Sequence, residues 1–309
     1  MITVVIPLYN KASTVLRCLK SVLSQTVLPN ELIVINDGSL DESLKIVKET
    51  IGFNTSIAVK IVDQQNSGVS YTRNKGVLLA RNDFVAFLDA DDEWHEEFIE
   101  SAQKVISRYQ DISLVTFKHR VCDDSLGCYV PKQVFGSKEI GLIKNYFSLA
   151  RSYPIVNSSK VVVNKLYFSK VGGFPVDAKV SEDLYLWIRL SECAPIAYFD
   201  RLLVTIFQAP DDSRDSRVGQ IPYPIVYYSS KHIAPISNND LYLLLWSIHF
   251  KHVLGSCVTN KEEALKRILY GIKLFKYNGV WLLCLLMIPK FIFKRIRMWR
   301  RIKMVKLSG

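Results

Sequence analysis

The sequence predicts an α/β protein in which helices flank a mostly parallel β-sheet. Short apolar runs of strand length alternate with amphipathic helical patterns through the first half of the 309 residues, as is typical of a parallel sheet covered on both faces. The most informative feature is the acidic segment 89–92, Asp-Ala-Asp-Asp, directly after the apolar run 84–88. A strand that ends in carboxylates brings them to the carboxyl edge of the sheet, where α/β proteins bind ligands.

The predicted elements of the first half follow from apolar spacing. Continuous apolar runs predict buried strands at residues 2–6, 32–35, 58–62, 84–88 and 112–117. Apolar residues at helical spacing predict helices at residues 12–23, 69–80 and 98–109. Ser39 and Glu42 have the spacing of a capping box, which predicts one more helix carrying Leu44 and Val47. Because the strands are parallel, the loops at residues 36–39 and 89–92 are expected to line one cleft.

The second half is less regular. Residues 120–175 are punctuated by glycine and proline, so we assign no strands there. A helix is expected to start near Ser181, with Glu182 and Asp183 in its first turn. The helix dipole also favours acids in a first turn, so ordinary capping is the alternative interpretation of this pair.

The expected domain organisation has two unequal parts. Residues 1–215 form a ligand-binding and catalytic domain, and residues 216–309 form a helical region. Leucine and isoleucine at helical spacing predict helices near 241–248 and 265–272 in the second part.

The net charge of +11 is concentrated in one segment, because residues 290–306 contain eight Lys and Arg and no acid, leaving +3 for the rest. The basicity therefore does not predict nucleic-acid binding by the body of the protein, and no nucleic-acid partner is expected. The six cysteines are scattered without metal-ligand spacing, which suggests reduced thiols in a cytosolic protein. The amino terminus lacks the pattern of a secretory leader, so export is not expected.

Several short segments, taken in order, resemble a known family. They are residues 4–10 (VVIPLYN), 36–39 (NDGS), 67–74 (SG to RN), 89–92 (DADD), 172–174 (GGF) and 182–183 (ED). Together they resemble the inverting family 2 glycosyltransferases of the GT-A fold, of the type that builds bacterial surface polysaccharides. The resemblance covers about residues 1–200.

The resemblance implies a nucleotide-sugar donor held across the carboxyl edge of the sheet. UDP is the favoured nucleotide, because members of the family commonly use it. By this resemblance Pro7 and Tyr9 would shape the base pocket and Asp37 would bind the base. Arg73 would lie near the base or the phosphates, and Asp89 would face the ribose.

The resemblance also implies a metal and a general base. Asp91 would bind Mn²⁺ or Mg²⁺, which neutralises the charge that builds on the departing diphosphate. Asp183 would take the proton of the acceptor hydroxyl, with Glu182 as the second choice. An inverting reaction is a single displacement with an oxocarbenium-like transition state, so no nucleophilic residue is needed.

One departure from the family lies near residue 208. Many relatives carry a histidine there that helps to hold the metal or the diphosphate, whereas this chain has none. Gln208, Arg214 or Arg217 are the possible substitutes. His249 and His252 lie on an apolar helical pattern and are expected to be packing or rim residues rather than ligands.

The carboxyl-terminal tail predicts a membrane surface contact. The apolar run 280–288 ends at Pro289, well short of the ~20 residues that a spanning helix needs. If residues 290–306 are helical, their apolar and basic side chains fall on opposite sides, as in helices that lie in an anionic membrane surface. The alternatives are a solvated basic helix and a nucleic-acid patch.

Taken together, these features predict a peripheral enzyme on the cytoplasmic face of the cell membrane. It would transfer one sugar from a nucleotide donor to a lipid-linked saccharide during polysaccharide assembly. The alternatives are transfer to a polyisoprenyl phosphate, and a non-catalytic module that binds nucleotide sugars.

Overall fold

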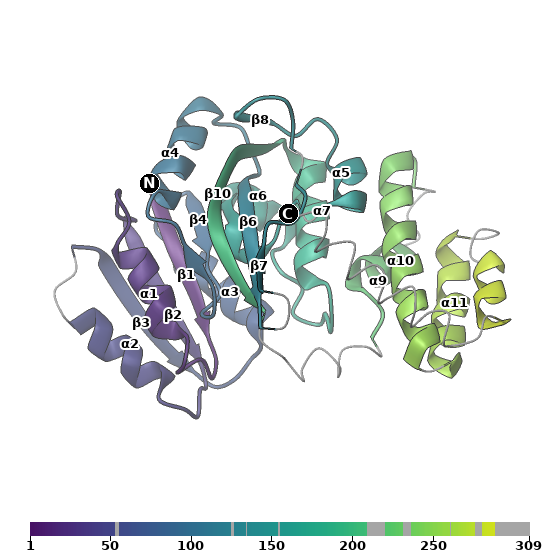
Figure 1. Ribbon diagram of the computed structural model, residues 1–309, viewed down its shortest axis with the longest axis horizontal. Helices are drawn as coiled ribbons and strands as arrows, with labels where there is room; N and C mark the ends of the chain where they lie inside the picture. Colours follow the sequence, from purple (N-terminus) through teal and green to yellow (C-terminus); the bar gives the residue numbers. More distant parts are fainter. Residues whose placement is uncertain are drawn as a thin grey trace.

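The computed structural model describes residues 1–52, 56–124, 127–133, 135–153, 155–208, 220–230, 236–259, 261–275 and 280–287. Helices flank a central sheet (Figure 1). The strand order of this sheet is β3-β2-β1-β4-β9-β6-β10-β5. The predicted α/β fold with a helix-flanked sheet is therefore confirmed.

The first four main strands form the predicted parallel unit. β1 (Ile2–Leu8) lies between β2 (Glu31–Asp37) and β4 (Phe84–Phe87), and β3 (Ala58–Gln64) completes the edge; all three pairings are parallel. Every residue of β2 is buried, as expected for a strand with helices on both faces. The carboxyl ends of these strands therefore meet at one edge.

Helices cover the two faces of this unit with separate hydrophobic cores. One core joins the sheet to α1 (Val15–Leu23), α2 (Ser43–Gly52) and α4 (Phe98–Arg108). The other joins it to α3 (Val69–Leu79) and to helices of the second half, including α7 (Glu182–Cys193). The start of α7 agrees with the predicted helix start near Ser181.

The second half adds strands that periodicity did not reveal. β9 (Val161–Asn164) runs antiparallel between β4 and β6 (Leu114–Asp123), and β6 pairs in parallel with the long β10 (Ile196–Gln208). Short strands complete the sheet, namely β5 (Glu93–Trp94), β7 (Gly127–Tyr129) and β8 (Ile140–Leu142). The sheet is mixed here because β9 inserts against the direction of its neighbours.

The predicted capping box at Ser39 is wrong. α2 begins at Ser43, whose backbone N–H donates to Asp41 Oδ1 at 3.0 Å. The Ser39 hydroxyl accepts instead from the backbone N–H of Asn10 at 3.0 Å. Because the Ser39 side chain is hydrogen-bonded to Asn10 just after β1, Asp41 and not Ser39 caps α2.

The expectation of reduced thiols is wrong for one pair of cysteines. Cys122 on β6 and Cys128 on β7 form a disulfide. They are direct partners in the antiparallel β6–β7 hairpin, so the register brings them together although no cysteine motif marks them. Cys18 and Cys257 are buried and are not part of a disulfide.

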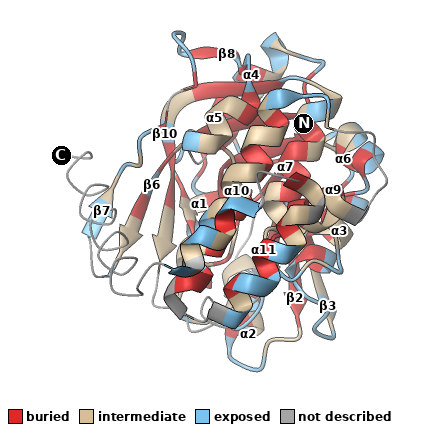
Figure 2. Ribbon diagram, turned by 90° about the vertical axis from the view of Figure 1, so that its right-hand side faces the viewer, coloured by how far each residue is buried: buried red, intermediate tan, exposed pale blue. Residues whose placement is uncertain are grey.

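The remaining helices pack on the side of the sheet that carries α7 (Figures 1 and 2). They are α5 (Tyr146–Ser152), α6 (Lys165–Val171), α9 (Tyr223–Ser230), α10 (Asn239–Thr259), α11 (Lys261–Phe275) and η2 (Trp281–Met287). The short helix η1 (Ser158–Lys160) instead contacts the strands β4, β6 and β10. α10 lies against α5, and its Leu241, Leu244 and Leu245 belong to the same core as α7. Within the described ranges, no helix is both long and apolar enough to cross a membrane.

His249 is a packing residue, as predicted. It is fully buried on α10, its ring centroid lies 5.4 Å from that of Phe275, and a side chain at Gly271 would collide with it. Burial, with a smaller effect of Arg267, lowers the pKa of both His249 and His252 to about 4. Both imidazoles are therefore neutral at physiological pH.

Candidate active site

A cleft of about 850 Å³ lies at the carboxyl edge of the parallel strands. It forms there because β1, β2 and β4 end side by side and the loops that follow them form its walls. The residues to which the family resemblance gave roles in binding the donor, the metal or the acceptor proton all line it: Pro7, Tyr9, Asp37, Arg73, Asp89, Asp91, Glu182 and Asp183. The structure therefore brings the predicted residues together from segments up to 176 positions apart.

Two turns at the cleft have strained backbones. In the described part of the chain, the non-glycine residues with positive φ are Asn10, at 49°, and Ser181, at 62°. Asn10 follows β1, and its side-chain oxygen accepts from the backbone N–H of Leu40 at 2.8 Å. Ser181 directly precedes the Glu182-Asp183 pair. Such strain persists only where surrounding contacts impose it, and it is concentrated at functional sites.

Asp37 holds the turn that leads into α3. Its Oδ1 accepts from the backbone N–H of Ser67 and from Gln64 Nε2, both at 2.8 Å, and its Oδ2 accepts from the Gly68 N–H at 2.9 Å. The residue is buried. The structure thus gives Asp37 a positioning role, while contact with a base stays a prediction.

Arg73 and Asp89 form an ion pair at the cleft, in which Arg73 is buried and Asp89 is partly exposed. Arg73 Nη2 lies 2.5 Å from Asp89 Oδ1, and the Arg73 side chain is 6% exposed. Burial acts to lower the pKa of Arg73, but Asp89, Glu182 and Asp183 together outweigh burial and raise it. The Arg73 Nε–H is buried without an acceptor among the described residues. Arg73 therefore couples the Asp89 turn electrostatically to the start of α7.

Asn74 is a positioning residue whose role the sequence did not reveal. Its Nδ2 donates to the Phe174 carbonyl at 2.7 Å, and its Oδ1 accepts from the Phe174 N–H at 2.9 Å. A Cβ on Gly173 would lie 2.6 Å from Asn74 Oδ1, so the loop needs glycine there. Asn74 thus ties α3 to the loop that leads to α7.

The carboxylates of the 89–92 turn differ in burial, since Asp92 is buried and Asp91 is partly exposed. Asp92 is buried; its Oδ2 accepts from the Ser159 hydroxyl at 2.5 Å and its Oδ1 from the Phe207 N–H at 3.0 Å. Burial, with a smaller contribution from Asp89, raises the pKa of Asp92 to about 8. Ser159 also accepts from the Asp89 N–H at 3.2 Å. Ser159 lies in the segment that showed no periodicity, so nothing in the sequence marks it.

Asp91 is the carboxylate that remains available to a cation. Its side chain is 32% exposed, and its Oδ2 lies 2.6 Å from the ammonium of Lys11. A metal that carries a diphosphate takes one or two protein carboxylates and the phosphate oxygens, so Asp91 fits this role. Within the described residues no cluster of three or more candidate metal ligands exists, so the phosphates would have to supply the remaining ligands.

Asp183 has the environment of a general base. Burial is the main cause that raises its pKa to about 6, and the adjacent Glu182 adds to the effect. Arg73 acts in the opposite direction but does not cancel the rise. A carboxylate that titrates near pH 6 is ionised at neutral pH and is a stronger base than an ordinary aspartate.

The proposed substitutes for the missing histidine are not found in the cleft. Gln208 is the last residue of β10 and is not among the described residues that line the cleft, although Ile206 and Phe207 are. Arg214 and Arg217 lie outside the described residues.

Part of the chain is similar in sequence to known glycosyltransferases. GlyA, a glycosyltransferase of Streptococcus pneumoniae serotype 4 (strain ATCC BAA-334 / TIGR4), is 37% identical over 109 residues. This match covers 35% of the present chain and 15% of GlyA, so it spans a small part of that relative.

Solved structures show the same fold. The superposition on the crystal structure of S. aureus TarS 1–349 spans 91% of this chain and 82% of the TarS chain, with a TM-score of 0.68 and 18% sequence identity. A second structure is that of the mannosyltransferase PcManGT from Pyrobaculum calidifontis in complex with GDP-Man and Mn²⁺. The superposition on it spans 92% of this chain and 78% of the PcManGT chain, with a TM-score of 0.58 and 16% sequence identity. These likenesses identify the fold as GT-A.

Sequence comparison with family models completes the assignment. Residues 3–171, more than half of the chain, match the model described as glycosyl transferase family 2. The protein therefore belongs to glycosyltransferase family 2.

Proposed function

We propose that the protein is an inverting, metal-dependent glycosyltransferase that moves one sugar from a nucleotide diphosphate sugar to a lipid-linked saccharide. The observation that carries this proposal is the single cleft in which Asp91, Arg73 and Asp183 meet. TarS, which shares the fold, has been crystallised with UDP and with UDP-GlcNAc, and PcManGT with GDP-Man and Mn²⁺.

In this proposal the donor lies along the floor of the cleft. Asp91 would hold Mn²⁺ or Mg²⁺, which, when bound, neutralises the charge that develops on the leaving diphosphate. Arg73, fixed by its pair with Asp89, places its positive charge beside the diphosphate of the donor. Pro7 and Tyr9 flank the expected base position, and Tyr9 is 46% exposed and open to contact.

Asp183 performs the proton transfer. As the acceptor hydroxyl attacks the anomeric carbon, its proton passes to the Asp183 carboxylate, while the bond from that carbon to the diphosphate oxygen breaks. Glu182 assists by raising the basicity of Asp183. One displacement inverts the configuration, so no covalent sugar–enzyme intermediate forms.

The membrane part of the proposal depends on the carboxyl-terminal region. Residues 290–306 carry eight bases and no acid, and on η2 just before them Trp281 is 75% exposed and Met287 is 85% exposed. Exposed apolar side chains beside a basic segment favour an anionic lipid surface, where a lipid-linked acceptor would also reside. The proposed location is the cytoplasmic face of the cell membrane.

The test of the donor site is calorimetric titration of UDP and of GDP into the full chain, with and without Mn²⁺. We expect one nucleotide, UDP by preference, to bind only with the metal, and we expect Asp91→Ala to lose this binding. Asp111→Ala removes an exposed carboxylate that does not line the cleft and serves as the control. Failure of a folded chain to bind either nucleotide would overturn the proposal.

The acceptor class is tested separately. Transfer is measured to a lipid-linked oligosaccharide and to a polyisoprenyl phosphate under the same conditions. Transfer to the oligosaccharide supports the proposal, whereas transfer to the lipid phosphate alone supports the alternative enzyme.

A further inference from the structure

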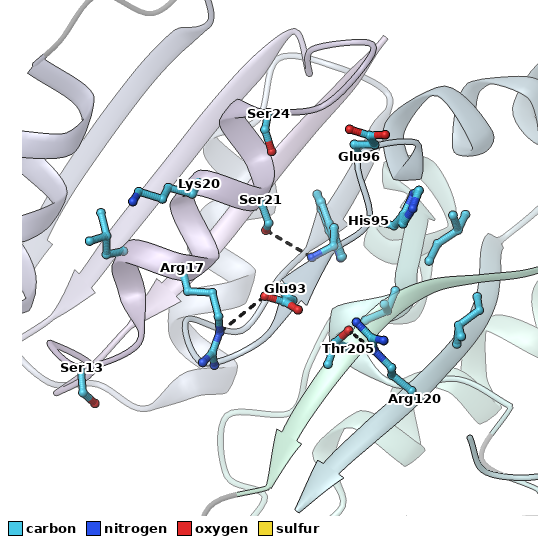
Figure 3. A pocket seen from close by; sticks show the side chains of 15 residues that line it. Ser13, Arg17, Lys20, Ser21, Ser24, Glu93, His95, Glu96, Arg120 and Thr205 are labelled. Atoms are coloured by element: carbon cyan, nitrogen blue, oxygen red, sulfur yellow. Dashed lines mark hydrogen bonds and ion pairs between the residues drawn. The ribbon is translucent and has the colours of Figure 1, made fainter. Parts of the chain in front are cut away.

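The structure contains a second cleft, of about 740 Å³, whose lining side chains are drawn in Figure 3. Its walls are α1, the turn around β5, the strand β6 and the middle of β10. Among the described residues, none lines both clefts. The function proposed above makes no use of this cleft.

Arginines enter the second cleft from opposite walls. Figure 3 shows Arg17 on α1 and Arg120 on β6 pointing toward its middle, with Glu93 between them. Lys20 adds a third basic side chain on the α1 side. With Glu93 and Glu96 as the acids, basic side chains outnumber acidic ones in this lining.

These cations have unused hydrogen-bond donors. Arg17 forms an ion pair with Glu93, whose Nε–Oε2 distance of 3.7 Å is too long for a hydrogen bond, and no hydrogen bond from Arg17 Nη1 to a described residue is present. Arg120 donates from Nε to Thr205 Oγ1 at 2.8 Å, and within the described ranges no hydrogen bond from its terminal nitrogens is present. Lys20 has no ion pair with any described residue. A guanidinium fork with open donors matches the geometry of a phosphate or carboxylate.

Arg17 also connects this cleft to the candidate active site. Its Nη2 donates to the Asp91 carbonyl at 2.5 Å, and its guanidinium lies 3.5 Å from the ring centroid of Phe207, which lines the first cleft. The second cleft therefore borders the metal end of the donor site. Arg17 is thus the residue through which the two clefts adjoin.

We propose that the second cleft binds an oxyanion carried by the saccharide acceptor, held between Arg17 and Arg120. Glu93 accepts hydrogen bonds from hydroxyl groups of the same sugar. The inference rests on the proposed glycosyl transfer and names its acceptor class: an acidic saccharide, whose oxyanion is either a phosphate or a uronic carboxylate.

The test uses the full chain saturated with UDP and Mg²⁺, so that the donor site is occupied. Equilibrium dialysis measures the binding of radiolabelled inorganic phosphate, glucuronate and glucose. We expect saturable binding of phosphate or of glucuronate, and the preferred anion identifies the source of the oxyanion. Glucose, which has no charge, is expected to bind far more weakly.

The decisive variant is Arg120→Gln, with Arg108→Gln as the matched control, because both arginines are exposed and Arg108 lines neither cleft. We expect Arg120→Gln to weaken anion binding by about tenfold or more, since the charge and the charge-assisted hydrogen bonds to the anion are lost. UDP binding should be unchanged in both variants. In transfer assays Arg120→Gln should raise the KM for an acidic acceptor and leave kcat unchanged.

Equal anion binding by wild type and Arg120→Gln would overturn the inference, as would binding of neither anion to the wild type. If the wild type does not bind UDP, the proposed donor site fails, and dialysis is repeated without nucleotide. Loss of anion binding in Arg120→Gln then still supports the second cleft, and unchanged binding still rejects it.

Discussion

Asp183 illustrates how local surroundings prepare a carboxylate for chemistry. It lies at the start of α7, where burial and the adjacent Glu182 raise its pKa to about 6 while Arg73 keeps that pKa from rising further. The residue is therefore ionised at neutral pH and protonated in mild acid. An aspartate with an ordinary pKa would stay ionised about two pH units lower.

Replacement of Asp183 by Asn should remove the base and retain the donor site. We expect kcat to fall by roughly 10²–10⁴-fold, the usual contribution of general base catalysis, with UDP affinity unchanged. The measurement combines initial rates with calorimetry. Glu192→Gln is the control, because this acid lies on the same helix and pairs with Arg189 outside the cleft.

The pH dependence of the wild-type rate tests the same base. Because the pKa of Asp183 is raised, kcat/KM should fall as the pH drops through about 6 and stay level above it. A rate that persists down to about pH 4, or near-normal turnover in Asp183→Asn, would show that another group accepts the proton.

The charge of Lys11 is expected to weaken metal binding by Asp91. Its ammonium lies 2.6 Å from Asp91 Oδ2, and the pair is partly exposed, so it is breakable. A divalent ion on Asp91 would be repelled by this charge.

Lys11→Met should therefore strengthen Mn²⁺ binding in the absence of nucleotide. We expect about a fivefold gain, which corresponds to roughly 1 kcal/mol for a partly exposed charge. Electron paramagnetic resonance of free Mn²⁺ measures the affinity. Lys45→Met, which breaks an exposed pair with Glu42, is the control. Unchanged or weaker Mn²⁺ binding in Lys11→Met would contradict the assignment of Asp91 as the metal ligand.

At the scale of elements, the candidate site depends on α3. This helix carries Arg73, which pairs with Asp89 after β4, and Asn74, which binds both backbone groups of Phe174 before α7. Adjacent side chains of one helix thus fix the relative positions of the acidic turn and the predicted base. The helix itself is held by Asp37 at its entry turn.

Asn74→Ala should damage both stability and activity. Two hydrogen bonds are lost and the Phe174 N–H is left without its acceptor, which we expect to cost about 1–3 kcal/mol of unfolding free energy. Urea unfolding measures this loss, and kcat should fall with it because the start of α7 is released. Asn82→Ala removes a hydrogen bond to Thr3 at the other end of β1 and should lower stability without lowering kcat. Equal effects of the two variants on kcat would argue against the positioning role.

At the scale of the whole molecule, charge is distributed unevenly. The segment 290–306 carries eight of the basic residues, and the remaining chain is nearly balanced at +3. Each base near an anionic bilayer contributes about 1 kcal/mol before screening, so several together determine whether the protein is bound.

Replacement of four tail bases by Gln should release the protein from phosphatidylglycerol vesicles. The substituted residues are Arg297, Arg300, Arg301 and Lys303. We expect at least a tenfold loss of binding in co-sedimentation at low salt, and a similar loss for the wild type when salt is raised. A protein with Lys45, Lys48, Lys104 and Arg108 changed to Gln has the same net charge and should bind as the wild type. Equal binding by both quadruple variants would reject a specific role for the tail.

Part of the site was predictable because its residues stand at the ends of recognisable strands. The apolar runs of β1, β2 and β4 have clear lengths, and parallel strands bring their following loops to one edge. Asp37 and Asp91 could therefore be placed in one cleft without coordinates, whereas the role of Pro7 came from the family resemblance. Glu182 and Asp183 depended on the family resemblance, because local pattern alone also fits a helix cap.

The sequence by itself determined the α/β class, the parallel strand unit and the carboxylates at its edge, because all of these follow from short-range periodicity. Only the tertiary structure decided the antiparallel insertion of β9, the Cys122–Cys128 disulfide and the burial of Asp92 against Ser159 and Phe207. The Asp92 contacts join residues 67 and 115 positions apart, and hydrogen bonds over such separations leave no periodic trace in the chain. They form only when packing brings the β4 turn, η1 and β10 together.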